Sequence, residues 1–224
     1  GTRCCASSDT SASVPASSAR GFLRRQASSL RHADDKLEQL PSYLCSLMKT
    51  TLRIMLLGAF SFALVSTAAF AVWAYGAACF IGELTMYAGC FGVFLLLAGL
   101  LLRPAVGWGG WGTFYAQFTL AFLAYAMLWC VAYFWLRDGF GEWIASLAGS
   151  AAFVGVIAAL RRGWPVFSMS AAVVFVTHSA GYFAGEHVCY TALHATWSML
   201  AWGMLYGLGF GAGIGFTLGR MRSA

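Results

Sequence analysis

Charged side chains are scarce in this sequence. They make up 10% of the 224 residues, against about 25% in a typical soluble domain. Apolar residues make up 60% and aromatic residues 16%. Polar surface this sparse cannot cover a water-facing globule, which excludes an ordinary soluble domain and indicates that lipid surrounds most of the chain. Twelve of the charged residues lie within the first 53 positions, so the rest of the chain is poorer still.

Catalytic and metal-binding signatures are missing as well. The sequence has no GxxxxGK[ST] phosphate loop, no HExxH helix and no GxSxG nucleophile elbow. Its seven cysteines form no CxxC pair and match no zinc-module spacing. These absences favour a protein that is not an enzyme, and no motif points to a particular family.

The N-terminal segment, residues 1–47, differs from the rest. It is rich in serine, alanine and arginine and low in hydrophobicity, so burial cannot offset chain entropy and we expect disorder. It fits a cytoplasmic tail, an organellar transit peptide, or a segment outside the natural protein. We favour the last reading, because Met48 is followed by Lys49 and an apolar run, which leaves residues 48–224 as the transmembrane domain.

Six apolar stretches follow, each close to the roughly 20 residues that a helix needs to cross a membrane. They are predicted as helices at 54–75, 82–102, 113–136, 142–160, 166–184 and 190–219. The connections between them are short, so consecutive helices are expected to lie adjacent and antiparallel. The sequence therefore predicts an all-α, polytopic membrane bundle of six transmembrane helices.

Basic residues lie almost entirely on one side of the predicted bundle. With the N-terminus inside, the inner side carries these residues: Lys49, Arg53, Arg103, Arg161, Arg162, Arg220 and Arg222. The outer side carries only Arg137. This positive-inside distribution predicts that both ends of the membrane domain face the cytoplasm. Because the net charge of +6 follows from the N-terminal segment and the helix ends, we exclude nucleic acid as a partner.

The first span has an alternative reading. Its basic start, apolar stretch and Ala69-Phe70-Ala71 are also features of a secretory signal with an A-x-A cleavage site. The apolar run from Ile54 to Tyr75 is longer than a usual signal core. We therefore expect an uncleaved helix in the lipid bilayer of a bacterial inner membrane, with an organellar membrane as the alternative.

Two cysteines fall in predicted outer loops. Cys79 follows the first span and Cys189 lies between the fifth and sixth. Both are expected on the oxidising side, where a disulfide between them would close the first outer loop onto the third. Pairing requires Cα atoms within about 7 Å.

The last span carries glycine at every fourth position. The series consists of Gly203, Gly207, Gly211, Gly215 and Gly219. This spacing places the glycines on one helix face, and in lipid only small residues permit the close backbone approach that favours helix association. We expect this face to receive another helix of the chain, from the fourth or fifth span. A homo-oligomer interface, a helix of a partner protein and a sliding surface are the alternatives.

Beyond position 53, the acidic residues and the histidines lie toward the outer side of the predicted bundle. The acidic residues are Glu83, Asp138, Glu142 and Glu186, and three histidines accompany them, His178, His187 and His194. In the predicted spans His178 and His194 lie four to five residues from the outer ends, roughly 6 to 8 Å deep at about 1.5 Å per residue. The loop between the two spans is short, so the two imidazoles are expected to face each other.

Ionisable residues within a membrane mark a pathway or site by default, and three kinds of site fit these residues. A transition-metal site would use His178, His187, His194 and Glu186. A bis-histidine haem would need only His178 and His194. An ion or proton path would combine the same two histidines with Glu83 or Glu186.

A purely structural reading also fits. In that case the two histidines are buried and satisfied by hydroxyls of neighbouring helices, which are Thr177, Ser179, Thr191 or Ser198. Glu186 and His187 would then be solvated loop residues.

The sequence as a whole favours a transport or channel protein that the glycine face could assemble into an oligomer. A haem- or metal-binding membrane subunit using His178 and His194 is the first alternative. A structural or assembly partner is the second. The sequence requires no cofactor and identifies no substrate or ion.

Overall fold

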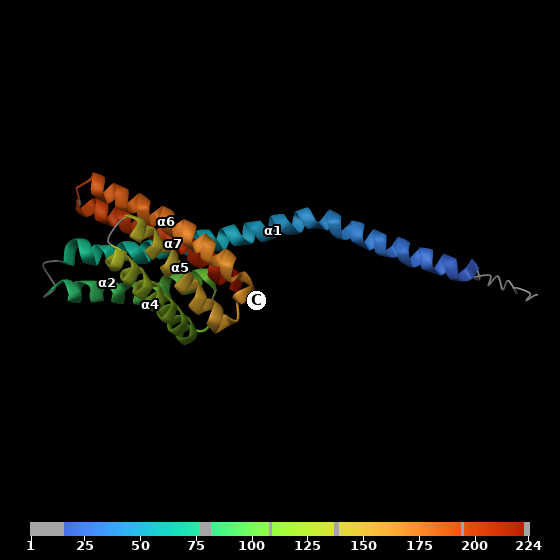
Figure 1. Cartoon of the computed structure of the whole chain (residues 1–224), viewed down its shortest axis with the longest axis horizontal. Coiled ribbons are helices and arrows are strands. Elements are labelled where there is room, and N and C mark those ends of the chain that lie inside the picture. The colour runs from blue at the N-terminus through green and yellow to red at the C-terminus, as the bar shows by residue number, and fades with distance from the viewer. Residues whose placement is uncertain (1–15, 77–81, 108, 137–138, 194, 222–224) are drawn as a thin grey trace, which may run out of the picture. The chain divides into compact units, whose positions relative to one another are not determined.

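The computed structural model describes residues 16–76, 82–107, 109–136, 139–193 and 195–221, which are almost entirely helical and contain no strand (Figure 1). The helices are α1 Ala16–Gly76, α2 Glu83–Leu97, α3 Arg103–Val106, α4 Trp111–Leu136, α5 Gly139–Arg161, α6 Phe167–Thr191 and α7 Thr196–Met221. A π-helical turn, η1 (Ala98–Leu102), joins α2 to α3, and a 3-10 turn, η2 (Trp164–Val166), precedes α6.

Among the described residues, six helical segments are long and apolar enough to cross a membrane. They are Cys45–Gly76, Leu84–Leu102, Trp111–Leu136, Gly139–Arg161, Trp164–Thr191 and Thr196–Met221. The predicted six-helix bundle is confirmed in the number and type of its helices. Large apolar side chains such as Phe60, Met127 and Trp135 remain exposed on the outside of these helices, as expected of a surface that faces lipid.

The chain divides into two units, residues 1–48 and 49–224. In the first unit the structure differs from the composition-based expectation of disorder, because α1 begins at Ala16 and residues 16–47 are helical. The physical reason lies in residues 23–40, where leucine, alanine, arginine, lysine, glutamine and glutamate, all good helix formers, are frequent. The start of the natural protein at Met48 stays a prediction.

The fifth span ends later than predicted, and the sixth span begins later than predicted. Helix α6 continues to Thr191 instead of stopping near residue 184, and α7 begins at Thr196 rather than near 190. The polar pair Glu186 and His187 suggested a loop, but both residues lie on the helix, where Glu186 is half-buried and His187 exposed. This correction moves His178 away from a helix end.

Helix α5 ends in a turn that is tied to α7. Arg162 adopts a left-handed backbone (φ 58), and the Gly163 N–H donates to the Ala158 carbonyl at 2.9 Å, as in a Schellman motif. A Cβ atom at Gly163 would lie 2.9 Å from Cγ of Met221. The start of the α5–α6 connection and the end of α7 are therefore in direct contact.

One tyrosine of α4 contacts the π-helical turn η1. The Tyr115 hydroxyl donates to the Leu96 carbonyl at 2.9 Å. The Tyr115 ring lies directly against Gly99, leaving no room for a side chain there. A π-turn interrupts the regular α-helical hydrogen-bond pattern, and here a side-chain hydroxyl binds a carbonyl just before the turn.

Helix α7 has glycine on two faces. A Cβ at Gly207 would lie 2.6 Å from the Ala63 Cα of α1, and one at Gly215 would lie 2.6 Å from the Ile54 carbonyl oxygen. On the other face a Cβ at Gly213 would lie 2.8 Å from the Val174 Cα of α6. The expected partner of the four-residue glycine series, the fourth or fifth span, was therefore wrong, because that face meets the first span. The fifth span meets the second glycine face.

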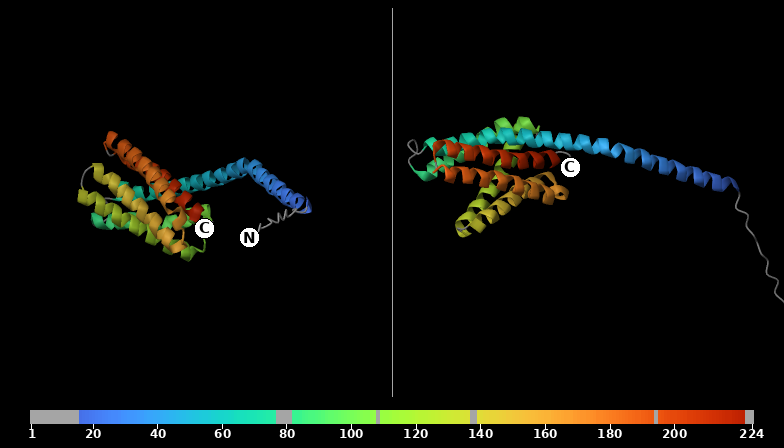
Figure 2. Two further views of the ribbon diagram at one scale, coloured as in Figure 1. Left: turned by 45° about the vertical axis from the view of Figure 1, so that its right-hand side comes forward. Right: turned by 90° about the horizontal axis from the view of Figure 1, so that it is seen from above.

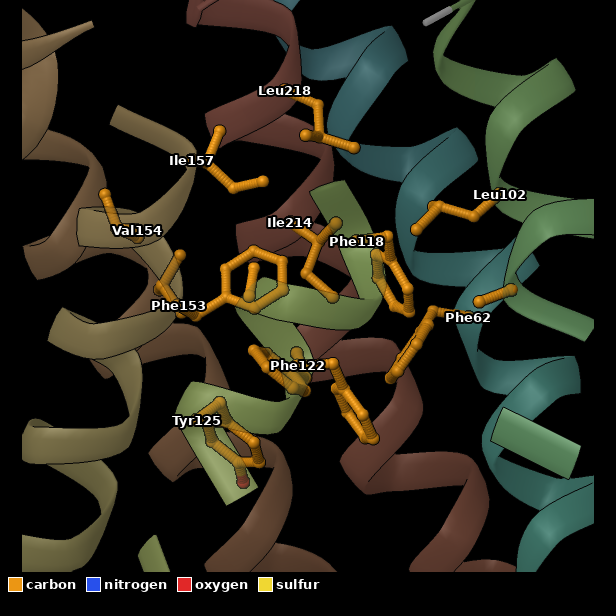
Figure 3. Close-up of a cluster of buried hydrophobic side chains, with 14 of the residues drawn as sticks. Phe62, Leu102, Phe118, Phe122, Tyr125, Phe153, Val154, Ile157, Ile214 and Leu218 are labelled. Atoms are coloured by element: carbon orange, nitrogen blue, oxygen red, sulfur yellow. The ribbon is translucent and has the colours of Figure 1, made fainter. Parts of the chain in front are cut away.

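Helices α4 and α5 lie side by side, as do α6 and α7 (Figures 1 and 2). Where these pairs and α1 meet, buried phenyl rings form the core (Figure 3). Phe62 lies edge-to-face on Phe210 with centroids 5.5 Å apart, and Phe153 lies 5.6 Å from Phe210. Tyr125 lies at one margin of this cluster, with its hydroxyl directed away from the phenyl rings (Figure 3).

Candidate functional site

The candidate site is centred on His178, which is 0% exposed. It lies 11 residues from the start of α6 and 13 from its end, which corresponds to about 17 and 20 Å along the helix. The sequence predicted this imidazole four to five residues from the end of the span, whereas α6 continues past residue 184 to Thr191. His178 is instead close to the middle of a membrane-spanning helix.

Both ring nitrogens of His178 are hydrogen-bonded to hydroxyls from other helices. The Tyr125 hydroxyl of α4 lies 2.6 Å from Nε2, and the Ser146 hydroxyl of α5 lies 2.8 Å from Nδ1. A neutral imidazole offers one donor and one acceptor, whereas a hydroxyl can serve as either. The imidazole is therefore fully satisfied, and it connects three helices.

The hydrogen bonds continue beyond these partners. The Tyr206 hydroxyl of α7 donates to the Tyr125 oxygen at 3.2 Å, and the Ser146 and Ser179 hydroxyls are 2.7 Å apart. We call these five residues, Tyr206, Tyr125, His178, Ser146 and Ser179, the His178 network. All five are buried and they come from α4, α5, α6 and α7.

The network has a consistent direction. A phenol carries one hydrogen, so Tyr125, which accepts from Tyr206, gives its own hydrogen to Nε2 of His178. Nδ1 then carries the ring hydrogen and donates to Ser146, which in turn donates to Ser179. If donor and acceptor are exchanged in every hydrogen bond, the heavy atoms keep their positions. A chain of groups that can exist in both arrangements can pass a proton from one end to the other.

Protonation of the imidazole would break this pattern. An imidazolium donates from both nitrogens, so Tyr125 could no longer donate to Nε2 and would have to accept. The hydrogen of Tyr125 would then turn toward Tyr206, and the hydroxyl of Tyr206 would lose its acceptor. The charge state of His178 thus sets the direction of the hydrogen bond between Tyr125 and Tyr206, which joins α4 to α7.

Close helix packing makes this network possible. A Cβ at Gly149 of α5 would lie 2.8 Å from the Tyr125 ring, so a larger residue would displace the phenol. Gly181 of α6 and Gly209 of α7 touch each other's helix backbones, which brings Tyr206 within reach of the network. The Phe210 ring lies 5.1 Å from the imidazole, edge-to-face. Aromatic rings and short helix separations therefore enclose the polar atoms.

Three of the hydroxyls predicted as partners of the histidines donate instead to backbone carbonyls. Thr177, Thr191 and Ser198 donate to carbonyls of their own helices or turns, those of Val173, His187 and Ala195. Only Ser179 joins the network, through Ser146. Sequence reasoning missed Tyr125, Ser146 and Tyr206. The available signal was that each is a polar residue within an otherwise apolar span, but the sequence cannot say which helix faces they share.

The metal and haem predictions depend on residues that the structure only partly describes. His194 lies outside the described residues, as does the side chain of Glu83 at the start of α2, and Cys79. Within the described part of the chain, no three histidine, cysteine or acidic side chains are grouped to hold a metal ion. At His178, a metal would have to replace the bond to Tyr125 or to Ser146. Both predictions stay predictions, as does the pairing of Cys79 with Cys189.

The six apolar helices define a multi-pass α-helical membrane protein. Comparisons of the chain with protein-family models, with curated proteins and with solved structures each give no match.

Proposed function

We propose that the protein is a proton-linked membrane transport protein in which His178 takes up and releases the proton. The observation that carries this proposal is the hydrogen bonding of a fully buried, mid-span imidazole at both nitrogens by hydroxyls of two other helices. Ionisable side chains inside membrane helices are costly and are characteristic of ion and proton pathways.

The network supports coupling between protonation and helix movement. A transporter needs two arrangements of its helices whose balance a ligand or proton can shift. Protonation of His178 reverses the Tyr206–Tyr125 hydrogen bond and leaves the hydrogen of Tyr206 without its acceptor. In this proposal, that buried and unpartnered hydrogen favours a different placement of α7 relative to α4. The proton would thereby act as the ligand that selects between two arrangements.

The glycine faces of α7 fit the same function. Side chains cannot interlock where Gly207 and Gly211 face α1 and Gly209 faces α6. Such contacts let the helix backbones approach closely, and in this proposal they are where α7 shifts along its neighbours. In this proposal the glycine series is a packing and sliding surface within one chain. The homo-oligomer and the partner-helix alternatives have less support, because helices of the same chain already lie on these faces.

The test is proton movement into proteoliposomes that contain a trapped pH-sensitive dye, driven by an imposed potassium diffusion potential. We expect flux above that of protein-free vesicles, and a reduction of about tenfold or more in His178→Gln. His187→Gln is the matched control, because this histidine lies on the same helix but is exposed. Wild-type flux equal to that of empty vesicles, or His178→Gln flux equal to wild type, would overturn the proposal.

A second readout reports the coupled movement itself. Trp129 of α4 and Trp202 of α7 each lie 5.7 Å from Tyr182, one helical turn from His178. Tryptophan fluorescence of the purified protein should therefore change with pH in the wild type. The same change should be absent in His178→Gln and preserved in His187→Gln.

A further inference from the structure

Two fully buried serines outside the His178 network have no hydrogen-bond partner among the described residues. They are Ser150 of α5 and Ser170 of α6, each 0% exposed. A third, Ser66, shares this property but lies on α1 against Gly207. Ser150 and Ser170 instead belong to the two helices that carry Ser146 and His178.

Other buried hydroxyls outside the His178 network do have hydrogen-bond partners. The buried hydroxyls of Ser198 and Thr217 donate to backbone carbonyls, those of Ala195 and Gly213. A buried polar group without a partner destabilises the fold, and native structures commonly satisfy it with a water molecule or an ion. The side chains of Ser150 and Ser170 are therefore candidates for binding something other than protein.

Their positions form a series that leads away from the network toward one end of the bundle. Ser150 lies four residues beyond Ser146 on α5, about 6 Å nearer the Arg161 end of that helix. Helix α6 runs the opposite way, so Ser170, nine residues before Ser179, lies about 13 Å nearer the same end. Measured along the helix axes, the step from Ser146 to Ser150 is about 6 Å and the further step to the level of Ser170 about 7 Å. One or two water molecules can bridge an axial step of this size.

We propose that Ser150 and Ser170 continue the proton path from the His178 network to the Arg161 end of the bundle, each by holding a water molecule. This inference rests on the proposed function. The distribution of basic residues predicts that the Arg161 end is cytoplasmic. The Tyr206–Ser179 chain then covers the middle of the membrane, and the two serines cover the inner half.

The transfer conserves protons and breaks no bond between heavy atoms. A proton that reaches Ser179 or Ser146 passes to the water bound by Ser150, and a proton of that water passes on toward Ser170. Each oxygen gains one hydrogen and loses another, and one proton is released at the Arg161 end. Rotation of the hydroxyls and waters then restores the starting arrangement.

The experiment measures vesicle proton flux and thermal stability for Ser150→Ala and Ser170→Ala. We expect each substitution to lower the flux about tenfold while the melting temperature changes little, because no protein group loses a hydrogen-bond partner when the hydroxyl is removed. A purely structural serine would change flux only together with stability. Ser198→Ala is the control, since this buried serine donates to the Ala195 carbonyl at the other end of the bundle.

The outcomes separate this inference from the proposed function. If wild-type flux is abolished by His178→Gln but unchanged in Ser150→Ala and Ser170→Ala, the path does not use these serines and only the present inference fails. If the wild type shows no His178-dependent flux, both fail. Loss of flux in Ser198→Ala to the same extent would also overturn the assignment, because the effect would then not be specific to the two serines.

Discussion

Gly58 of α1 and Gly211 of α7 lie in reciprocal backbone contact. A Cβ on either residue would come within 2.5 Å of the carbonyl oxygen of the other. Distances this short leave no space for any side chain, and the opposing atoms are backbone, which cannot move aside as a side chain can. The first and last spans are therefore in backbone contact that only glycine permits at these two positions.

We predict that Gly211→Leu lowers the stability of the fold. Overpacking a close contact typically costs about 1 to 3 kcal/mol. We expect a cost near the upper end of this range, because the atoms opposite Gly211 include backbone atoms, which cannot move aside. Thermal unfolding in detergent measures the effect. Gly92→Leu in α2 is the matched control, because no atom lies within 4 Å of a Cβ there.

If Gly211→Leu instead leaves the melting temperature unchanged and dissociates an oligomer, the glycine series is an interface between subunits. Unchanged stability and unchanged oligomeric state together would contradict both readings.

The number and type of the helices could be predicted from the sequence because each span leaves its own apolar run. Which faces meet could not be predicted in the same way. The Gly207 and Gly211 face indicates that some helix approaches closely, but the counterpart on α1 is a mixture of Gly58, Ala59 and Ala63 with larger residues and has no simple spacing. The short connections along the chain favoured the fourth and fifth spans as partners of the glycine series. In the structure its partner is the first span.

The candidate site shows the same limit. His178 stands out in the sequence because an ionisable residue in a span is rare. Tyr125 and Ser146 do not stand out, because tyrosine and serine are tolerated in many spans. Only the arrangement of α4, α5 and α6 places their hydroxyls on the two nitrogens of one imidazole.

We predict that Tyr125→Phe and Tyr206→Phe have coupled effects on stability. Tyr125→Phe removes the partner of Nε2 of His178 and the acceptor of Tyr206, at a cost of about 1 to 3 kcal/mol for the polar groups left buried. Tyr206→Phe in the Tyr125→Phe background should then cost less than in the wild type, because its acceptor is already gone. A double-mutant cycle of unfolding free energies measures this coupling. Additive effects would show that the two hydroxyls do not act through one bond.

We predict that Gly99→Ala destabilises the bundle through the ring of Tyr115, which occupies the space that the new methyl group needs. The expected loss is about 1 to 3 kcal/mol. Tyr115→Ala alone should also be destabilising, since it deletes the bond to the Leu96 carbonyl. In the Tyr115→Ala background, however, Gly99→Ala should cost almost nothing. A full penalty for Gly99→Ala in that background would mean that the clash lies elsewhere.

We predict that both ends of the membrane domain face the cytoplasm, because the basic residues Arg103, Arg161 and Arg220 lie at the C-terminal ends of the second, fourth and sixth spans. A reporter active only in the cytoplasm and one active only outside it, each fused after Ala224, measure the topology. Activity of the external reporter alone would reverse the assignment. A fusion after Leu136, at the end of the third span, should give the opposite result to the fusion after Ala224.

The contact between Gly58 and Gly211 also bears on how the protein is made. Of the six spans, the one that contains Gly58 leaves the ribosome first and the one that contains Gly211 leaves last. At about 5–20 residues per second, roughly ten to thirty seconds separate the two glycines during synthesis. Throughout that interval the first span lies in the bilayer without its closest neighbour, and its small-residue face is exposed to lipid or to an insertion factor. Assembly of the bundle is therefore completed only after its final helix has entered the membrane.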